Sequence, residues 1–292
     1  MALTLKNDQV KLEFATFGGA LSSIKDADGV EYLWQGDATY WSGQAPVLFP
    51  ICGSLRDNRA TIVEKEMIMP RHGLVRKKEF ELFKQADDYI IFRIQSDDDM
   101  YQQFPFEFEL QIRYDLLKKG VRTTYTVKNL DAKTLPFCIG GHPGFNCPLL
   151  AGETYEDYYL EFEKDEKLTV PTSYPETGLL NLVERHELPI KGNVLDLSYD
   201  LFSQDVLTLD RLKSRSVKLL SRKHRKGLQV DFADFPYLVL WSTANHDPFI
   251  ALEPWSGLST DVHATNDFLD KPNVQKVVSG QERKLAFDIN LL

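Results

Sequence analysis

The chain is poor in cysteine and lacks long apolar runs, and each shortage excludes a class of protein. Its three cysteines, Cys52, Cys138 and Cys147, are odd in number and have no CxxC spacing. This argues against a disulfide framework or a zinc site and predicts reduced thiols. No apolar run approaches the ~20 residues that span a bilayer, and the N-terminus reaches a charge at Lys6 without the apolar stretch of a secretory signal. We therefore expect a cytoplasmic protein.

An excess of positive charge is also missing. The formal net charge of −9 would repel nucleic acid and anionic membranes, so we expect neither as a partner. The basic run 222–226 is interpreted as a solvated turn. With 292 residues, 43% of them hydrophobic, the chain can bury a sizeable core. Because it has no internal repeat, low-complexity tract or flexible linker, we predict one domain over 1–292, present as a monomer or a homodimer.

Segments with helical period are few and short, at 98–103 and 210–214, whereas alternation of apolar and polar residues is frequent. Phe106–Tyr114 and Val121–Val127 both alternate, and the turn Lys118-Lys119-Gly120 lies between them, which predicts a β-hairpin. Region 163–200 is interpreted as a loop-rich excursion. Further strands are predicted at 10–15, 89–95, 158–162, 217–220, 228–232, 237–241 and 284–291. Many strands without a strand–helix rhythm predict an all-β fold, a large antiparallel β-sandwich.

Several catalytic signatures are absent. There is no GxSxG, no cysteine in a nucleophile context and no glycine-rich phosphate loop. Glycoside hydrolysis would usually use a pair of carboxylates; Asp205 could supply one, but its spacing does not single it out. The residues with acid/base chemistry lie instead in three short motifs, at 71–73, 141–143 and 252–255. In each, a polar residue is flanked by residues that restrict the backbone.

The most informative motif is Gly140-Gly141-His142-Pro143-Gly144-Phe145-Asn146. Gly140 and Gly141 permit backbone angles that other residues avoid, and Pro143 fixes φ directly after the histidine. A side chain restricted in this way can project into a cleft with little freedom, as a general acid or base requires. The alternative interpretation is a surface turn with an incidental histidine.

The other two motifs contain His72 and Glu253. Arg71-His72-Gly73 follows an extended segment, and Leu252-Glu253-Pro254-Trp255 follows the apolar run 248–251. Glu253 is therefore predicted at the end of a buried strand that Pro254 terminates, where a carboxylate is costly unless it is hydrogen-bonded or functional. The alternatives are a His72 bonded to a loop carbonyl and a structural ion pair of Glu253 with an arginine. Together, the two histidines and the carboxylate form an acid/base set.

At these motifs the chain resembles the aldose 1-epimerase (galactose mutarotase) family, and within it the LacX-like branch. The resemblance covers essentially the whole length, in blocks at 18–20, 33–37, 46–53, 71–73, 141–146 and 252–255. The His-Pro-x-Phe-Asn block is the most specific of these. The resemblance implies a galactose mutarotase-like supersandwich, with a sugar bound in an open cleft on one sheet.

The resemblance also implies a role for each motif residue. Glu253 would be the general base that removes the proton from the anomeric hydroxyl, and His142 the general acid that protonates the ring oxygen. His72 would bind the sugar near that oxygen. The implied activity is aldose 1-epimerase, an isomerase of carbohydrate metabolism that interconverts the α and β anomers of a small aldohexose. No metal or organic cofactor is expected, because no electron or group leaves the sugar.

Sugar-binding residues are implied less directly. The family has an arginine in the loop after the Phe-Pro block, where this chain has Ser54, and Arg56 or Arg59 could reach the same hydroxyls. We take Arg56 and Asp205, with Trp34 and Phe145, as the predicted substrate-binding set. Taken one at a time, the other tryptophans are interpreted as core residues: Trp41, Trp241 and Trp255. The remaining histidines have no assigned role: His186, His224, His246 and His263.

Two further hypotheses stay open. Four arginines, Arg56, Arg59, Arg71 and Arg76, lie close in sequence and could clamp a phosphate, which would make the substrate a hexose phosphate. Their alternative interpretation is solvated loop charges. The other hypothesis is a non-catalytic sugar-binding protein on the same fold. Faster anomer exchange would distinguish either enzyme from the binding protein.

Overall fold

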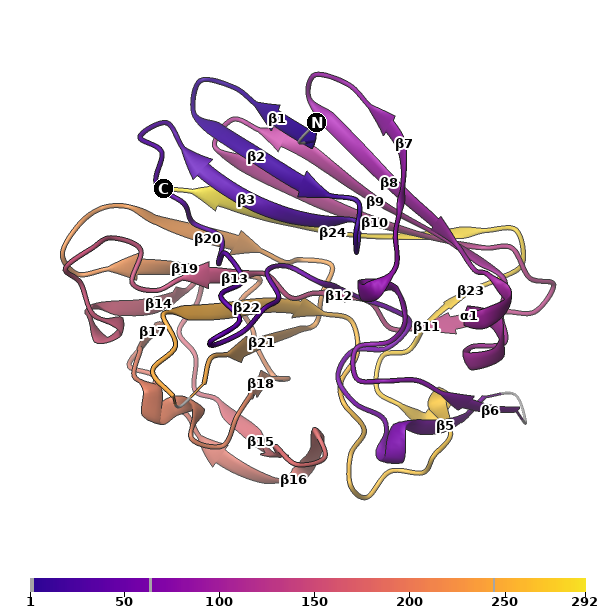
Figure 1. Ribbon diagram of the computed structural model, residues 1–292. Coiled ribbons are helices and arrows are strands. Elements are labelled where there is room, and N and C mark those ends of the chain that lie inside the picture. The colour runs from indigo at the N-terminus through magenta and orange to yellow at the C-terminus, as the bar shows by residue number, and fades with distance from the viewer. Residues whose placement is uncertain (1–2, 63–64, 244) are drawn as a thin grey trace.

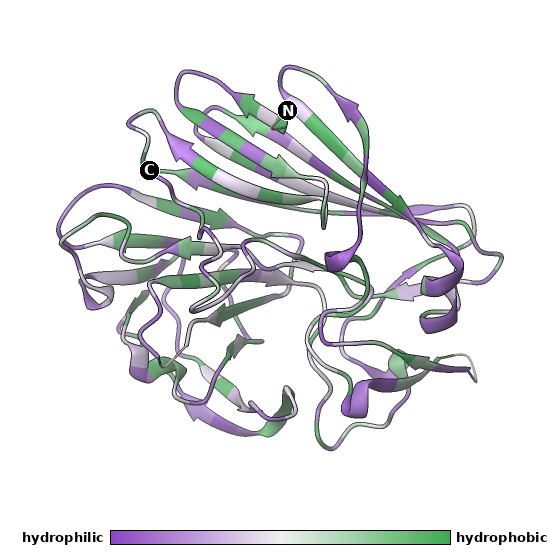
Figure 2. Cartoon of the chain, viewed as in Figure 1, coloured by the Kyte–Doolittle hydropathy of each residue, from purple (hydrophilic) through white to green (hydrophobic). Residues whose placement is uncertain are grey.

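The computed structural model describes residues 3–62, 65–243 and 245–292. Within them, antiparallel strands form two large sheets and four small ones (Figure 1). Apolar and polar residues alternate along strands such as β2 (Val10–Ala15), as Figure 2 shows, and the apolar ones are buried. The predicted all-β fold of antiparallel sheets packed face to face is confirmed.

The largest sheet has nine strands and contains the predicted hairpin. Gly120 lies opposite Leu117 in that hairpin, so Lys118 and Lys119 form its turn. In order across the sheet, the strands are β17 (Val194–Asp196), β14 (Tyr158–Phe162), β19 (Ser216–Ser221), β20 (Gly227–Asp231), β24 (Glu282–Leu291), β10 (Gly120–Asn129), β9 (Phe108–Leu117), β8 (Tyr89–Gln95) and β7 (Glu81–Gln85).

A six-stranded sheet lies beneath the nine-stranded one in Figure 1. Gly141 brings the two sheets together, since a Cβ there would lie 2.9 Å from the ring of Phe287 on β24 and 3.0 Å from the hydroxyl of Tyr125 on β10. The strands are β18 (Leu207–Leu209), β21 (Tyr237–Trp241), β22 (Phe249–Trp255), β12 (Gly140–Gly141) and β4 (Val47–Leu48), with β13 (Gly144–Asn146) also paired to β22.

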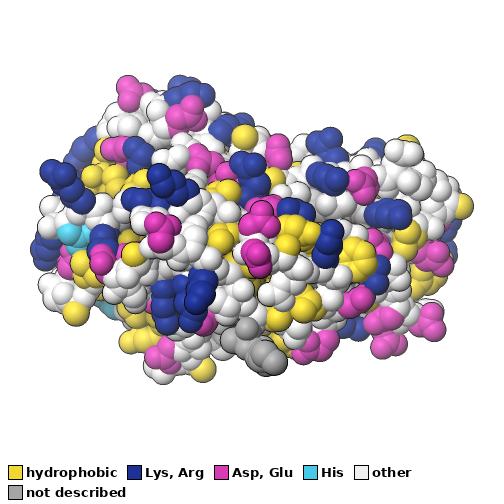
Figure 3. All heavy atoms as spheres, turned by 90° about the horizontal axis from the view of Figure 1, so that it is seen from above, with side chains coloured by type: hydrophobic (Ala, Val, Ile, Leu, Met, Phe, Trp, Pro, Cys, Tyr) yellow, Lys and Arg dark blue, Asp and Glu magenta, His cyan; other side chains and the backbone are white. Residues whose placement is uncertain are grey.

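A three-stranded sheet covers part of the nine-stranded one. It consists of β1 (Leu3–Lys6), β2 and β3 (Ala20–Asp26). Phe14 on β2 packs with its ring 4.9 Å from that of Tyr114 on β9, whose hydroxyl donates to the carbonyl of Gly19. Seen from above, this side of the molecule carries acidic and basic side chains interspersed (Figure 3), as expected of a solvated surface.

The three remaining sheets are two-stranded: β5 (Arg59–Ile62) with β6 (Lys65–Ile68), β11 (Leu135–Phe137) with β23 (Gln275–Val277), and β15 (Thr169–Tyr174) with β16 (Leu179–Glu187). The last pair and β17 lie in region 163–200, which was predicted to be loop-rich. A register shift between Pro171 and Thr172 interrupts the pairing. Prolines and glycines therefore hid the alternation that marks a strand.

The α-helix α1 (Asp98–Gln103) forms as predicted, and Asp97 caps it by accepting the backbone N–H of Met100 at 2.7 Å. Short 3₁₀ turns are η1 (Arg56–Asn58), η2 (Val75–Lys77), η3 (Tyr155–Asp157), η4 (Tyr199–Phe202) and η5 (Phe268–Asp270). No helix in the described ranges has the length and apolarity to cross a membrane.

The predicted helical turn at 210–214 is wrong. The carboxylate of Glu166 accepts the backbone N–H groups of Lys213 and Ser214 and the Ser214 hydroxyl. A buried carboxylate that takes these donors competes with helical hydrogen bonds. The segment is an irregular loop instead.

Pro254 does not terminate its strand, contrary to the sequence-based prediction. Pro254 pairs with Leu238, and β22 continues to Trp255. On the other side of β22, β13 pairs with 249–251 and β12 pairs with Trp255 alone. Among the described residues, β22 therefore has no strand partner on that side at Pro254. The proline, which has no N–H to donate, removes no inter-strand hydrogen bond there.

Candidate active site

A cavity of about 210 Å³ lies beside the six-stranded sheet, and all three sequence motifs meet in it. Glu253 comes from β22, His142 from the link between β12 and β13, and His72 from the turn before η2. Asp205, from the loop before β18, lines the same cavity. Residues from distant parts of the chain are thus brought to one place.

His142 and Glu253 form the centre of the site. Nε2 of His142 lies 3.3 Å from Oε2 of Glu253, and both side chains are buried. The indole N–H of Trp255 donates to the same Oε2 at 3.1 Å. Burial raises the pKa of the Glu253 carboxyl well above its usual range, although the Trp255 hydrogen bond opposes the rise. Burial lowers the pKa of His142 to about 3.

Aromatic rings fix the orientation of the His142 imidazole. Its ring centroid lies 4.8 Å from that of Trp41 and 5.6 Å from that of Trp241, and its backbone N–H donates to Pro46. Gly140 and Gly141 do not have positive φ, so the prediction that they supply unusual backbone angles is wrong. They are needed for close approach: a Cβ at Gly140 would lie 2.8 Å from the Trp255 ring.

His72 occupies a strained position beside the pair. Its φ of 69° is in the left-handed region that favours glycine. Nδ1 accepts the N–H of Gly53 at 3.2 Å, and the His72 N–H donates to the Gly53 carbonyl at 2.8 Å. Acceptance at Nδ1 places the proton of the neutral ring on Nε2. Burial lowers the pKa of His72 well below its ordinary value, and the electrostatic effects of His142, Arg76 and Arg71 lower it further.

Asp205 is, after His72, the second non-glycine residue of the cavity with left-handed backbone, at a φ of 73°. Its Oδ1 accepts the indole N–H of Trp241 at 2.9 Å. The charge of Asp205 also contributes to the raised pKa of Glu253. A carboxylate held this way can accept hydrogen bonds from sugar hydroxyls.

Two arginines also line the cavity, although neither belongs to the substrate-binding set predicted from sequence. Nε of Arg71 donates to the Ser54 hydroxyl at 2.9 Å, and the Ser54 N–H donates to Oγ of Ser259 at 3.0 Å. Arg76 lies on η2 and is half-buried. Burial and the charge of Arg71 lower the pKa of Arg76.

Three of the predicted substrate-binding residues lie outside the cavity lining. Arg56 donates to Oδ1 of Asn266 at 2.8 Å and to three backbone carbonyls in 261–264, each at 3.0 Å. The structure therefore does not bring Arg56 to the cavity, because its guanidinium holds that loop. Arg59 pairs with Glu66 at the surface. Trp34 donates to the Trp41 carbonyl at 2.7 Å, and Phe145 is fully buried in the core.

Sequence reasoning interpreted Trp41, Trp241 and Trp255 singly as core residues, yet all three line the cavity. A lone tryptophan carries no pattern that separates a core position from a cavity wall. Arg76 has a weak signal, since it lies only four residues after His72. The positive φ of His72 and Asp205 is a signal of a functional site that only coordinates reveal.

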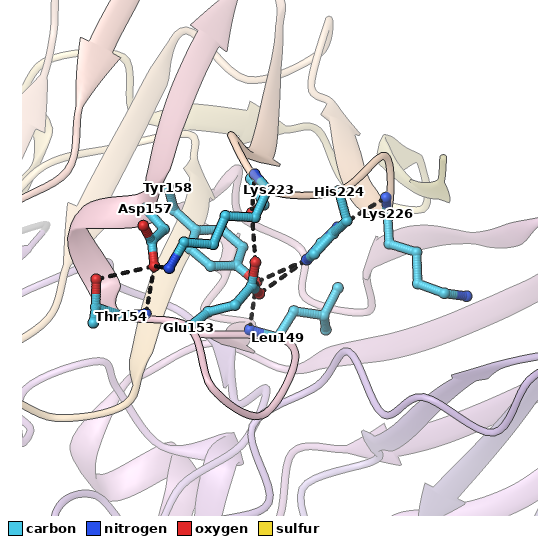
Figure 4. Close-up of polar contacts among 9 residues, drawn as sticks. Leu149, Glu153, Thr154, Asp157, Tyr158, Lys223, His224 and Lys226 are labelled. Carbon is cyan, nitrogen blue, oxygen red and sulfur yellow. Dashed lines mark hydrogen bonds and ion pairs between the residues drawn. The ribbon is translucent and has the colours of Figure 1, made fainter.

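A second group of titratable side chains lies away from this cavity, around Glu153 (Figure 4). Its carboxylate accepts from the hydroxyls of Tyr158 and Ser221 and lies 2.9 Å from Nε2 of His224. Nδ1 of His224 accepts the N–H of Lys226, so its Nε2 carries the ring proton. These bonds tie the loop before β14 to the turn between β19 and β20, which is a structural role.

None of the three cysteines lines the cavity. Cys52, Cys138 and Cys147 are buried and not joined in disulfides. Among the residues that the structure describes, no group of three or more His, Cys, Asp or Glu side chains is placed to hold a metal ion.

A model of the aldose 1-epimerase family matches residues 1–266. The chain belongs to the aldose 1-epimerase family. Among curated proteins, the plasmid-encoded protein LacX of Lactococcus lactis subsp. lactis is 52% identical over 298 residues, and the chromosomal LacX is 51% identical; both alignments cover 100% of each chain. The family and the LacX-like branch inferred from the motifs are both confirmed.

Solved structures of the same fold extend the comparison. A galactose mutarotase related enzyme from Lactobacillus acidophilus superposes with a TM-score of 0.94 at 28% identity, covering 100% of this chain and 97% of that one. A galactose mutarotase-like protein from Lactobacillus casei gives a TM-score of 0.92 at 31% identity, with 100% of both chains covered. The galactose mutarotase-like fold predicted from the sequence is thus confirmed for this member of the aldose 1-epimerase family.

Proposed function

We propose that this aldose 1-epimerase family member interconverts the α and β anomers of an aldohexose by acid/base ring opening and closure. The observation that carries the proposal is the 3.3 Å approach of His142 to Glu253 in a cavity walled by tryptophans. Tryptophan faces suit the apolar C–H faces of a sugar ring, and the pair supplies a base and an acid at adjacent positions.

In the proposed reaction, the Glu253 carboxylate takes the proton from the O1 hydroxyl while His142 gives a proton to the ring oxygen O5. The C1–O5 bond breaks and C1 and O1 form a carbonyl, so no atom or electron leaves the sugar. Rotation about C1–C2 presents the other carbonyl face, and the steps reverse with the roles exchanged. His72, with its proton on Nε2, is placed to stabilise charge that develops on the ring oxygen.

The shared burial of the pair suits a reaction that runs in both directions. A protonated Glu253 beside a neutral His142 holds the same number of protons as a carboxylate beside an imidazolium. Burial favours the uncharged pattern, as the raised pKa of Glu253 and the lowered pKa of His142 indicate. A sugar whose O1 and ring oxygen face the two groups exchanges one proton with each, so the total is restored after every turnover.

The test is the rate of anomer exchange of glucose and galactose, measured by NMR against the spontaneous rate. The wild-type protein is expected to accelerate exchange, and Glu253→Gln to abolish the acceleration while the circular dichroism spectrum stays unchanged. Glu153→Gln, at the polar cluster of Figure 4, is the matched control and should retain activity. Full activity in Glu253→Gln would refute the assignment. Saturable sugar binding without acceleration in the wild type would indicate the binding-protein alternative.

A further inference from the structure

We infer that the sugar handled by this site carries a phosphate monoester on O6, held by Arg71 and Arg76. This rests on the proposed function, because the location of O6 follows from the ring oxygen that His142 protonates. Of the four arginines that lie close in sequence, two do not line the cavity: Arg56 donates to backbone carbonyls, and Arg59 pairs with Glu66. The two others line the cavity.

The two cavity arginines lack a counter-charge. Among the described side chains, neither guanidinium forms an ion pair with a carboxylate, and Nε of Arg76 is buried without a hydrogen-bond partner. By contrast, Arg59 and Arg185 each donate to a carboxylate of the protein, and Arg56 donates to an amide oxygen and to backbone carbonyls. A buried N–H donor without a partner is costly, and a ligand that accepts from it recovers that cost.

Arg71 is held in a defined position at the edge of the cavity. Ser54 accepts from its Nε on one side. Gly178, in the turn between β15 and β16, lies so close that a Cβ there would collide with the guanidinium and with the Ser54 hydroxyl. Ser54, where the resemblance implied an arginine, therefore positions Arg71, whose guanidinium lines the cavity.

The charges are arranged along the cavity. The positive charge of Arg76 contributes to the lowered pKa values of both His72 and His142, and the charge of Arg71 to that of His72. Asp205, by contrast, acts on Glu253. Arg71 directly precedes His72 in the chain, and both arginines line the cavity together with the two histidines, so the inference assigns the arginines to the ring-oxygen side of the sugar.

Sugar chemistry then places the anion. In a hexopyranose, C5 is bonded to the ring oxygen and carries C6, so a substituent on O6 extends from the end that faces the histidines. A phosphate monoester carries about −1.5 to −2 charges at pH 7, which matches two guanidinium groups, whereas a carboxylate carries one. Bidentate acceptance from arginine is the geometry that phosphate oxygens favour. The bound phosphate would also offset the positive charge that disfavours protonation of His72.

The experiment compares anomer exchange of glucose, glucose 6-phosphate and glucuronate by NMR. Wild-type kcat/KM is expected to be highest for the 6-phosphate. Arg71→Gln and Arg76→Gln should each reduce the ratio of kcat/KM for the 6-phosphate to that for glucose by roughly tenfold to a hundredfold, the size expected for a lost charge-assisted hydrogen bond. Arg76→Lys, which keeps the charge, should retain more of the preference. Arg59→Gln is the surface control and should leave the ratio unchanged.

Equal or higher kcat/KM for glucose than for its 6-phosphate would overturn the inference, as would an unchanged ratio in both glutamine variants. Equal acceleration of glucuronate would overturn the assignment to phosphate. If no sugar is accelerated, the proposed function fails, and calorimetric titration with glucose 6-phosphate and glucose decides the inference separately. Tighter binding of the phosphate that is lost in Arg71→Gln supports the inference, and equal affinity overturns it.

Discussion

Replacing Trp255 by Phe is expected to move the alkaline limb of the pH–rate profile to higher pH and to lower its plateau. Nε1 of Trp255 donates to Oε2 of Glu253 at 3.1 Å, and both residues are buried. The hydrogen bond stabilises the carboxylate, which is the form that accepts a proton from the sugar. Without the bond, the pKa of Glu253 rises further above its already elevated value, so the Glu253–His142 pair keeps its one proton to higher pH and is less often a carboxylate beside an imidazolium.

The size of the shift follows from the energy of the bond. A hydrogen bond to a charged group contributes about 1.5–3 kcal/mol, and one pKa unit corresponds to about 1.4 kcal/mol. The limb should therefore move by about one to two pH units. Over the plateau, kcat/KM should fall by about tenfold to a hundredfold relative to the wild type, because the form with a carboxylate beside an imidazolium is less populated.

The assay is kcat/KM for anomer exchange, corrected for the spontaneous rate, across pH 4 to 9. Trp241→Phe is the matched control, because it removes an indole N–H that donates to Asp205 instead. The control should not move the limb to higher pH. An alkaline limb that stays in place in Trp255→Phe, or moves to lower pH, would refute the assignment of Glu253 as the base of the pair.

Three further predictions concern stability. Burial holds the pKa of His142 at about 3 against 6.5 in the unfolded chain. The unfolded state therefore binds an extra proton between these two pH values, and the free energy of unfolding should fall by about 1.4 kcal/mol per pH unit as pH decreases. Urea denaturation of His142→Gln should show a smaller fall with pH, and a fall as steep as in the wild type would contradict the prediction. Gly141→Ala should lower the urea midpoint by an amount equivalent to about 1–3 kcal/mol, since its Cβ would press on Phe287; an unchanged midpoint would show that the sheets can separate. Arg56→Gln should lose about 1–3 kcal/mol of stability, because the variant lacks the hydrogen bonds of the guanidinium to 261–266, and its KM should be unchanged. A raised KM at full stability would instead place Arg56 in the sugar-binding set.

Much of the fold could be predicted from the sequence where one face of a strand is buried. Strands 10–15, 89–95, 158–162 and 237–241 form over the predicted residues, because burial of one face requires alternation. The predictions failed where tertiary contacts control the backbone. Glu166 takes the N–H groups that a helix at 210–214 would use, and Pro254 is tolerated because of a gap in the neighbouring strands.

The acid/base residues were accessible to sequence reasoning because His72, His142 and Glu253 stand in backbone-restricting motifs. The tryptophan walls of the cavity, and which of the four candidate arginines line it, were not. Arg56 and Arg76 are both arginines in polar stretches, yet one binds backbone carbonyls of a distant loop and the other lines the cavity. Nothing in local sequence distinguishes a guanidinium that has partners from one that lacks them.

The strand pattern, the family and the three residues with proton chemistry follow from periodicity and short motifs, so the sequence was enough to predict them. Which groups share one cavity, and how burial alters their pKa values, depends on tertiary packing. Ser54 holds Arg71, Asp205 meets Trp241, and His142 meets Glu253 only when segments separated in the chain pack together. The pKa of a carboxyl and the partner of a guanidinium depend on surroundings in three dimensions, and those surroundings come from packing rather than from neighbours in sequence.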